Sequence, residues 1–141
     1  MKQGQPEFEL QCVIADLLRW GAYPGIYWTA IPNGEDRPRK KNSRGNWYSP
    51  TGQRLQRMGV KPGVADLIFL VRGKAVALEL KADKTKYQSP EQKAFQKEWE
   101  EAGGDYYVKK TYEDAVELLE FLRIIKPVKG SERFEPRSHA A

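Results

Sequence analysis

The feature that most constrains the fold is a pair of apolar runs separated by a two-residue turn signal. Leu67–Val71 contains no polar residue, as expected of a buried strand, and residues 75–80 form a second run with strand character. Because Arg72 and Gly73 read as the turn between them, the spacing predicts a β-hairpin in which Val71 faces Lys74. The register of every other pair in the hairpin follows from that turn.

Three charged residues lie at the open end of this hairpin. The numbers of facing residues sum to 145, so Asp66 is predicted to lie directly opposite Glu79, with Cβ atoms about 4.5–5.5 Å apart. Lys81 is two residues beyond Glu79 and therefore points to the same face. Two carboxylates this close repel each other unless a cation lies between them, and Mg²⁺ favours such sites. The pattern indicates metal-assisted phosphodiester hydrolysis; the alternative is a solvated strand end.

The residue composition excludes several other chemistries. The single cysteine, Cys12, lies in the first apolar helix, where we expect a core or near-core thiol, and the single histidine, His139, lies in a polar tail. The chain can therefore form neither an intramolecular disulfide nor a Cys/His zinc cluster. Serine–histidine and cysteine–histidine mechanisms are excluded in the same way. Acid–base or metal chemistry must rest on carboxylates and lysine.

Two further polar residues are candidates for the same site. Gln92 shares a helical face with Phe95 and Trp99, so it is turned toward the sheet, although a capping box at Ser89 explains it equally well. Glu7 lies on the inward face of the first helix, one turn before its apolar stripe. It either completes a metal shell or only complements the helix dipole. Glu9 is the rival candidate at this helix start.

A basic segment, residues 35–62, carries eight basic and two acidic residues, and its formal charge of +6 exceeds the +5 of the whole chain. Trp47 and Tyr48 lie within it. This distribution favours nucleic acid as a partner, and the alternative is a solvated loop without one. The candidate DNA contacts are its eight basic side chains and two lysines that follow the hairpin: Arg37, Arg39, Lys40, Lys41, Arg44, Arg54, Arg57, Lys61, Lys84 and Lys86.

The predicted elements follow the order α-β-β-β-α-β-α, which indicates a single α/β domain with a mixed sheet flanked by helices. Helices are expected at residues 7–20, 89–102 and 111–126, with a short one possible at 52–58, and further strands at 26–31 and 106–108. We expect the domain to span residues 1–126 and a disordered polar tail to span 127–141. The chain has no apolar run of about 20 residues and no signal-peptide core near Met1, so we expect a cytoplasmic protein.

In this order and spacing, five short motifs resemble the VRR-NUC (virus-type replication-repair nuclease) domain, a branch of the PD-(D/E)xK nuclease superfamily. They are E-F-E-L-Q at residues 7–11, I-P-N-G at 31–34, G-V-K-P-G-V-A-D-L at 59–67, E-L-K at 79–81 and S-P-E-Q at 89–92. The resemblance covers residues 7–122 and implies a restriction-endonuclease-like fold. One departure is Ala65, where the family usually has proline; altered rigidity at the start of the strand is expected, not lost activity.

The resemblance implies a role for each matching residue. Asp66 and Glu79 would bind Mg²⁺ or Mn²⁺, with the backbone carbonyl of Leu80 as an extra ligand, and Lys81 would be the catalytic lysine. The family's glutamate four residues before a glutamine maps onto Glu7, and its later glutamine maps onto Gln92. The resemblance is to stand-alone members of the family, which are small viral or bacterial proteins that dimerise and cut branched DNA, including four-way junctions. It therefore implies that this chain is a homodimer that cuts branched DNA in a bacterial or phage-infected cell.

Three functions remain open at the level of sequence. The first is a structure-selective endonuclease that acts as a homodimer on branched or flapped DNA. The second is a restriction-type or exonucleolytic enzyme with the same chemistry. The third is a DNA-binding module that has lost catalysis, against which the presence of Glu7, Asp66, Glu79 and Lys81 argues.

Overall fold

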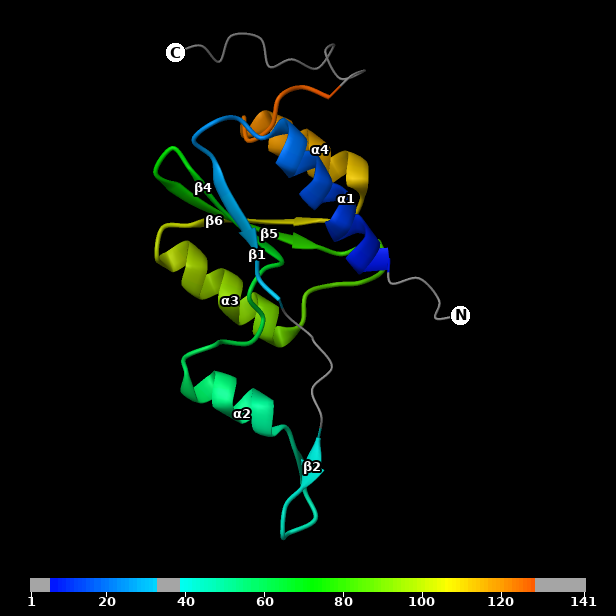
Figure 1. Cartoon of the computed structure of the whole chain (residues 1–141), viewed down its shortest axis with the longest axis vertical. Coiled ribbons are helices and arrows are strands. Elements are labelled where there is room, and N and C mark those ends of the chain that lie inside the picture. The colour runs from blue at the N-terminus through cyan, green and yellow to red at the C-terminus, as the bar shows by residue number, and fades with distance from the viewer. Residues whose placement is uncertain (1–5, 33–38, 129–141) are drawn as a thin grey trace.

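A four-stranded mixed sheet lies at the centre of the computed structural model, which describes residues 6–32 and 39–128 (Figure 1). The strand order is β1-β4-β5-β6, with the first three strands antiparallel and β6 parallel to β5. A helix connects β5 to β6, as a parallel pair requires. The bounds are β1 Tyr27–Ala30, β4 Leu67–Val71, β5 Lys74–Leu80 and β6 Asp105–Lys109.

The central hairpin has the predicted register. Val71 pairs with Lys74 and Leu67 with Leu78, so the facing residues do sum to 145. Arg72 and Gly73 have φ values of 49° and 82°, the left-handed conformation that a two-residue type I′ turn requires at both positions. The Arg72 guanidinium also donates a hydrogen bond of 2.8 Å to the carbonyl of Arg123, which ties the turn to the end of the last helix.

One face of the sheet is covered by α1 (Pro6–Gly21) and α4 (Tyr112–Phe121). The main core lies here and includes Ile14, Leu18, Phe69 and Leu119. Because α1 makes one turn in 3.6 residues, its buried stripe excludes Cys12, which we expected in or near the core. Val13 and Cys12 are both exposed, so the prediction of a core thiol is wrong.

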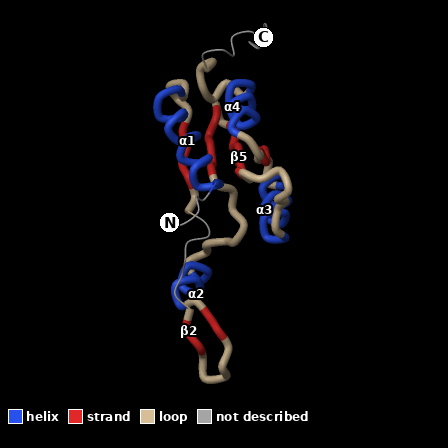
Figure 2. Tube along the Cα trace, turned by 90° about the vertical axis from the view of Figure 1, so that its right-hand side faces the viewer, coloured by secondary structure: helices blue, strands red, loops and turns tan. Residues whose placement is uncertain are grey.

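The opposite face is covered over β5 and β6 by α3 (Pro90–Glu101), whose Phe95 and Trp99 pack against Ala77 and Tyr106. The helix begins at the Ser89 capping box that the sequence predicts. Figure 2 shows α3 on the other side of the sheet from α1. These two layers leave the carboxyl ends of β5 and β6 beside the first turn of α3.

A basic arm, consisting of residues 39–61, extends away from the sheet (Figures 1 and 2). It contains β2 (Lys40–Lys41), β3 (Trp47–Tyr48) and α2 (Pro50–Arg57). The short helix was predicted, and it begins two residues earlier because Ser49 caps it. The β2–β3 hairpin was not predicted, because each of its strands is only two residues long. No residue of α2 is buried.

The predicted order α-β-β-β-α-β-α is confirmed by α1, β1, β4, β5, α3, β6 and α4, into which the arm inserts its own three elements. Val128, in the predicted tail, packs against the core. The remainder of that tail, residues 129–141, and the candidate DNA contact Arg37 lie outside the described residues. Within the described ranges, no helix combines the length and apolar character needed to cross a membrane.

Candidate active site

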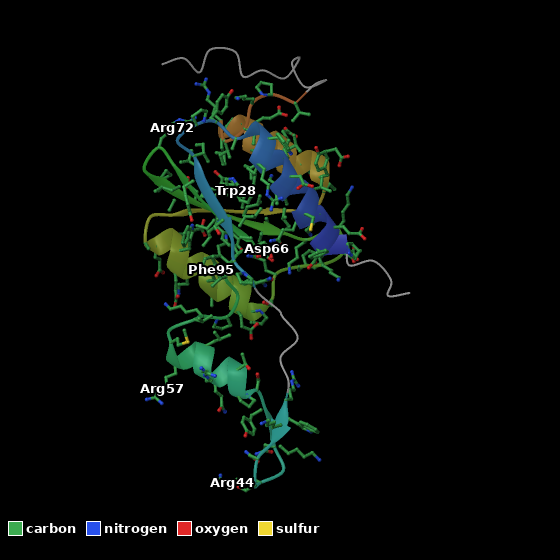
Figure 3. The ribbon with its side chains drawn as sticks, in the orientation of Figure 1. Trp28, Arg44, Arg57, Asp66, Arg72 and Phe95 are labelled. Atoms are coloured by element: carbon green, nitrogen blue, oxygen red, sulfur yellow. The ribbon has the colours of Figure 1, made fainter. Side chains whose placement is uncertain are left out.

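Asp66 lies directly before β4 and is tied to its neighbours on both sides. Its backbone carbonyl accepts a hydrogen bond of 2.9 Å from the amide of Ile31, and its Oδ2 accepts one of 2.7 Å from the amide of Leu80. The carboxylate is therefore held across the hairpin against the strand that carries Glu79. Figure 3 labels Asp66 in the part of the molecule that contains the sheet, away from Arg44 and Arg57 of the basic arm.

Glu79 is a buried charged residue with one side-chain oxygen satisfied and one not. Its exposed fraction is 3%. Oε1 accepts a hydrogen bond of 2.9 Å from Nε2 of Gln92 and lies 3.8 Å from Nζ of Lys81, whose side chain is only 12% exposed. Oε2 is buried and has no hydrogen-bond partner. Leaving a buried polar group unsatisfied costs about 1–3 kcal/mol, and more for a charged one, so the site is incomplete as a purely structural arrangement.

The electrostatics of the pair favour a bound positive charge. Burial, followed by the nearby charge of Asp66, raises the pKa of Glu79 to about 8. Burial also raises the pKa of Asp66 above its ordinary value, against the hydrogen bond from the Leu80 amide. Lys81 lowers both pKa values but does not reverse either shift. In the metal-free chain Glu79 therefore keeps its proton at neutral pH, and a cation placed between the two side chains would favour the charged form of both.

The donor set fits a hard divalent cation. Asp66 and Glu79 present carboxylate oxygens, one of them the unpartnered Oε2 of Glu79, and Mg²⁺ is commonly held by one or two carboxylates with water and phosphate completing its shell. The half-buried Glu7 is close enough for its charge to raise the pKa of both residues. No group of three His, Cys, Asp or Glu side chains in the described part of the chain is close enough to hold a metal, so Glu7 is outside such a cluster.

Gln92 makes both of the contacts that the sequence left as alternatives, one to the helix cap and one toward the sheet. Its Oε1 accepts a hydrogen bond of 2.9 Å from the amide of Ser89 and completes the capping box. Its Nε2 donates to Glu79 at the same time. The cap thus fixes the direction of the amide group that the carboxylate accepts from. Leu80 contributes its amide to Asp66, and ligation by its carbonyl remains a prediction.

Gly63 is a positioning residue that the sequence reasoning missed. Its φ is +76°, and a Cβ at this position would overlap the backbone of Glu91 and Gln92. The loop that leads into Asp66 is therefore packed directly against the first turn of α3. The Pro62-Gly63 turn signal marked the bend, but sequence spacing alone does not show that another backbone lies against it.

The predicted DNA contacts within the described ranges are all exposed: Arg39, Lys40, Lys41, Arg44, Arg54, Arg57, Lys61, Lys84 and Lys86. Seven of them lie in the basic arm, which contains no acidic residue. Lys61 forms an ion pair of 3.4 Å with Glu98 of α3, so part of its charge is already neutralised within the chain. Lys84 and Lys86 lie outside the arm, on the loop between Lys81 and the Ser89 cap of α3.

Comparison with solved structures gives a match to a protein described as "VRR_NUC domain protein". The TM-score is 0.62 at 22% sequence identity, and the alignment covers 85% of this chain and 89% of that chain. The chain has the fold of a VRR-NUC domain. The fold expectation drawn from the five motifs is thereby confirmed. No protein-family model matches the sequence, and no curated protein matches it either.

Proposed function

We propose that this chain is a metal-dependent DNA endonuclease of the VRR-NUC type, which hydrolyses phosphodiester bonds with Mg²⁺ or Mn²⁺. The observation that carries the proposal is the buried Glu79, held between Asp66, Lys81 and Gln92 with its Oε2 unpartnered. A buried and unsatisfied carboxylate is costly to keep for structure alone. Its raised pKa beside a second carboxylate is also typical of a functional site.

Asp66 and Glu79 would hold the cation, with the Leu80 carbonyl as a further candidate ligand. Glu7, which lies outside this cluster, would have to approach to become one. When bound, the cation supplies Lewis-acid polarisation of the phosphate and a more acidic water. The chain positions these groups through the Leu80 amide on Asp66 and the Gln92 amide on Glu79. The Lys81 ammonium lies on the same side as Glu79, where it can orient the attacking water or neutralise charge on the phosphate.

Branched DNA, such as a flap or four-way junction, is the proposed substrate, and the active species is proposed to be a homodimer. The basic arm supports a polyanionic partner because its seven basic residues carry a charge of +7. Its helix α2 has no buried residue, so the arm is open to such a partner. An extended, unburied basic projection can follow a DNA arm outside the cleavage site. The alternative is that the arm is a solvated segment without a partner, and the salt dependence of DNA binding distinguishes the two.

A cleavage panel tests the proposal. The protein is incubated with Mg²⁺ or Mn²⁺ and with single-stranded, duplex, flap and four-way-junction DNA, while its mass in solution is measured. We expect cleavage of the branched DNA and loss of that cleavage in Lys81→Ala, with DNA binding retained. Lys97→Ala, an exposed lysine of α3 outside the predicted DNA contacts, is the matched control. Full metal-dependent cleavage by Lys81→Ala would refute the assignment of the active site.

A further inference from the structure

The loop between β5 and α3 is held in a defined shape by its own hydrogen bonds. Oδ1 of Asp83 accepts from the amide and from the hydroxyl of Thr85, at 2.8 and 2.7 Å. The amide of Lys86 donates to the carbonyl of Asp83 at 3.0 Å. The loop starts directly after Lys81 and ends at the Ser89 cap, so both of its ends are fixed by residues of the candidate active site.

Tyr87 of this loop is an exposed aromatic residue whose ring is held by a lysine. Its exposed fraction is 77%. Nζ of Lys110 lies 4.3 Å from the ring centroid and donates a hydrogen bond of 3.1 Å to the carbonyl of Lys84. Lys110 thus attaches the ring to the loop through a cation–π contact. The high exposure means that most of the ring surface remains available to a ligand.

The position of this ring follows from the sheet. The amide of Lys81 donates to the carbonyl of Lys109 at 2.9 Å, and Lys110 is the next residue. Because β5 and β6 are parallel, both strands end at the sheet edge that carries Glu79 and Lys81. Tyr87, held by Lys110, therefore lies at the border of the candidate active site, and the exposed Lys84 and Lys86 belong to the same loop.

We propose that Tyr87 and Lys110 form a stacking subsite for an unpaired nucleotide base next to the scissile phosphate. The inference rests on the proposed nuclease function and narrows its substrate. Bases within a continuous duplex are already stacked on their neighbours, whereas an unpaired base offers a free face to an aromatic ring, and lysines beside it neutralise the backbone. The substrate class is therefore DNA with a single-stranded nucleotide at the cleavage site, such as a flap or an open junction.

Fluorescence of 2-aminopurine, placed as the first unpaired base of a flap DNA, tests the subsite directly. The titrations are made with Mg²⁺ in the Lys81→Ala background, so that the DNA is bound and not cut. We expect quenching on binding, since stacking quenches this base. Tyr87→Ala should abolish the quenching and weaken binding roughly tenfold, as lost base stacking does, whereas Tyr87→Phe should retain both.

Tyr27→Ala is the matched control, because Tyr27 is also an exposed tyrosine, 66% accessible, but lies on the edge strand β1. Unchanged quenching and affinity in Tyr87→Ala would overturn the proposal. Equal losses in Tyr87→Phe and Tyr87→Ala would also overturn it, because they would assign the effect to the hydroxyl group.

Cleavage by the otherwise unmodified chain separates this inference from the proposed function. If that chain cuts flap DNA, Tyr87→Ala should reduce kcat/KM on the flap by roughly tenfold and leave the weaker cleavage of duplex unchanged. Cleavage of both DNAs at unaltered rates would refute the subsite alone. If no DNA is cut with either metal, the proposed function fails, and the fluorescence titration still decides whether the ring stacks on a base.

Discussion

The carboxyl end of β5 and the basic arm both concentrate charge, but they hold it in opposite ways. Glu79 and Lys81 are almost completely buried and have fixed partners, whereas the basic side chains of the arm that we predicted to contact DNA are all exposed. Buried charge is costly and sensitive to geometry, which suits the stabilisation of a reacting phosphate. Exposed charge costs little and tolerates many geometries, which suits contacts to a DNA backbone. The proposed function accordingly assigns chemistry to the first region and DNA binding to the second.

Removing the charge of Glu79 should give the largest effect. We expect Glu79→Gln to reduce cleavage by about a thousandfold or more, because several kcal/mol of transition-state stabilisation depend on the cation that it helps to hold. At a pH above 8, where Glu79 is ionised, the same variant should raise the melting temperature of the metal-free protein, since it removes a buried negative charge beside Asp66. Single-turnover cleavage and thermal unfolding in EDTA measure the two effects.

Glu91→Gln is the control for that variant, because Glu91 is an exposed carboxylate in the first turn of α3. Equal cleavage by Glu79→Gln and the unmodified chain would contradict the assignment of the chemical step to the carboxyl end of β5.

Neutralising the arm should weaken DNA binding without slowing the chemical step. Combined alanine substitution of Arg39, Lys40, Lys41 and Arg44 should reduce the affinity for DNA by roughly tenfold or more. The slope of log affinity against log salt concentration should become less steep by about 0.9 for each phosphate that is no longer neutralised. The rate at saturating DNA should stay the same. Binding titrations over a range of salt concentrations measure the slope, with Lys93→Ala/Lys97→Ala on α3 as the control. An unchanged slope would show that the arm does not bind the DNA backbone.

Gly63 connects the two regions, because the chain leaves the arm and packs against α3 at this residue. Gly63→Ala should slow cleavage by about tenfold, as the added Cβ displaces the first turn of α3 and with it Gln92. Gly59→Ala has a similar left-handed backbone, φ +98°, but its Cβ would meet nothing within 4 Å. Equal rates in the two variants would show that backbone strain alone, and not the position of Gln92, is responsible.

The pH dependence of stability should be the smallest effect, and it should be confined to the sheet end. The pKa of Glu79 is raised from its ordinary 4.5 to about 8 in the folded chain. Between these values the folded state binds a proton that the unfolded state does not, so the stability that it contributes is present at low pH and is lost as pH rises toward 8. In EDTA, the melting temperature should fall by several degrees over this range, relative to Glu79→Gln.

At high pH, addition of Mg²⁺ should restore the melting temperature that the unmodified chain has lost relative to Glu79→Gln. Parallel melting curves for the two proteins at every pH would contradict the raised pKa.

The sequence predicted the fold and the facing carboxylates because both depend on short-range patterns. A two-residue turn fixes the register of β4 and β5, and the side-chain alternation of a strand then places Asp66, Glu79 and Lys81 together. The solvent exposure of Cys12 and the tight contact at Gly63 could not be predicted in this way. Each depends on which other element lies against the residue, and that is decided by packing between distant segments.

The structure of the arm was also beyond the sequence patterns. Its strands are too short for an alternating pattern, and its hairpin turn depends on Asn42, whose side chain accepts hydrogen bonds from the amides of Arg44 and Asn46. The charge of the segment was evident, but its extension away from the sheet was not. That extension separates the basic side chains of the arm, such as Arg44 and Arg57, from Asp66.

Calorimetric titration of Mn²⁺ into the DNA-free protein tests the central claim most directly, namely that Asp66 and Glu79 together hold a cation. We predict saturable binding to the unmodified chain, loss of most of the affinity in Asp66→Asn, and unchanged binding in Asp83→Asn, an exposed aspartate of the neighbouring loop. The same affinity in Asp66→Asn and in the unmodified chain would contradict the claim.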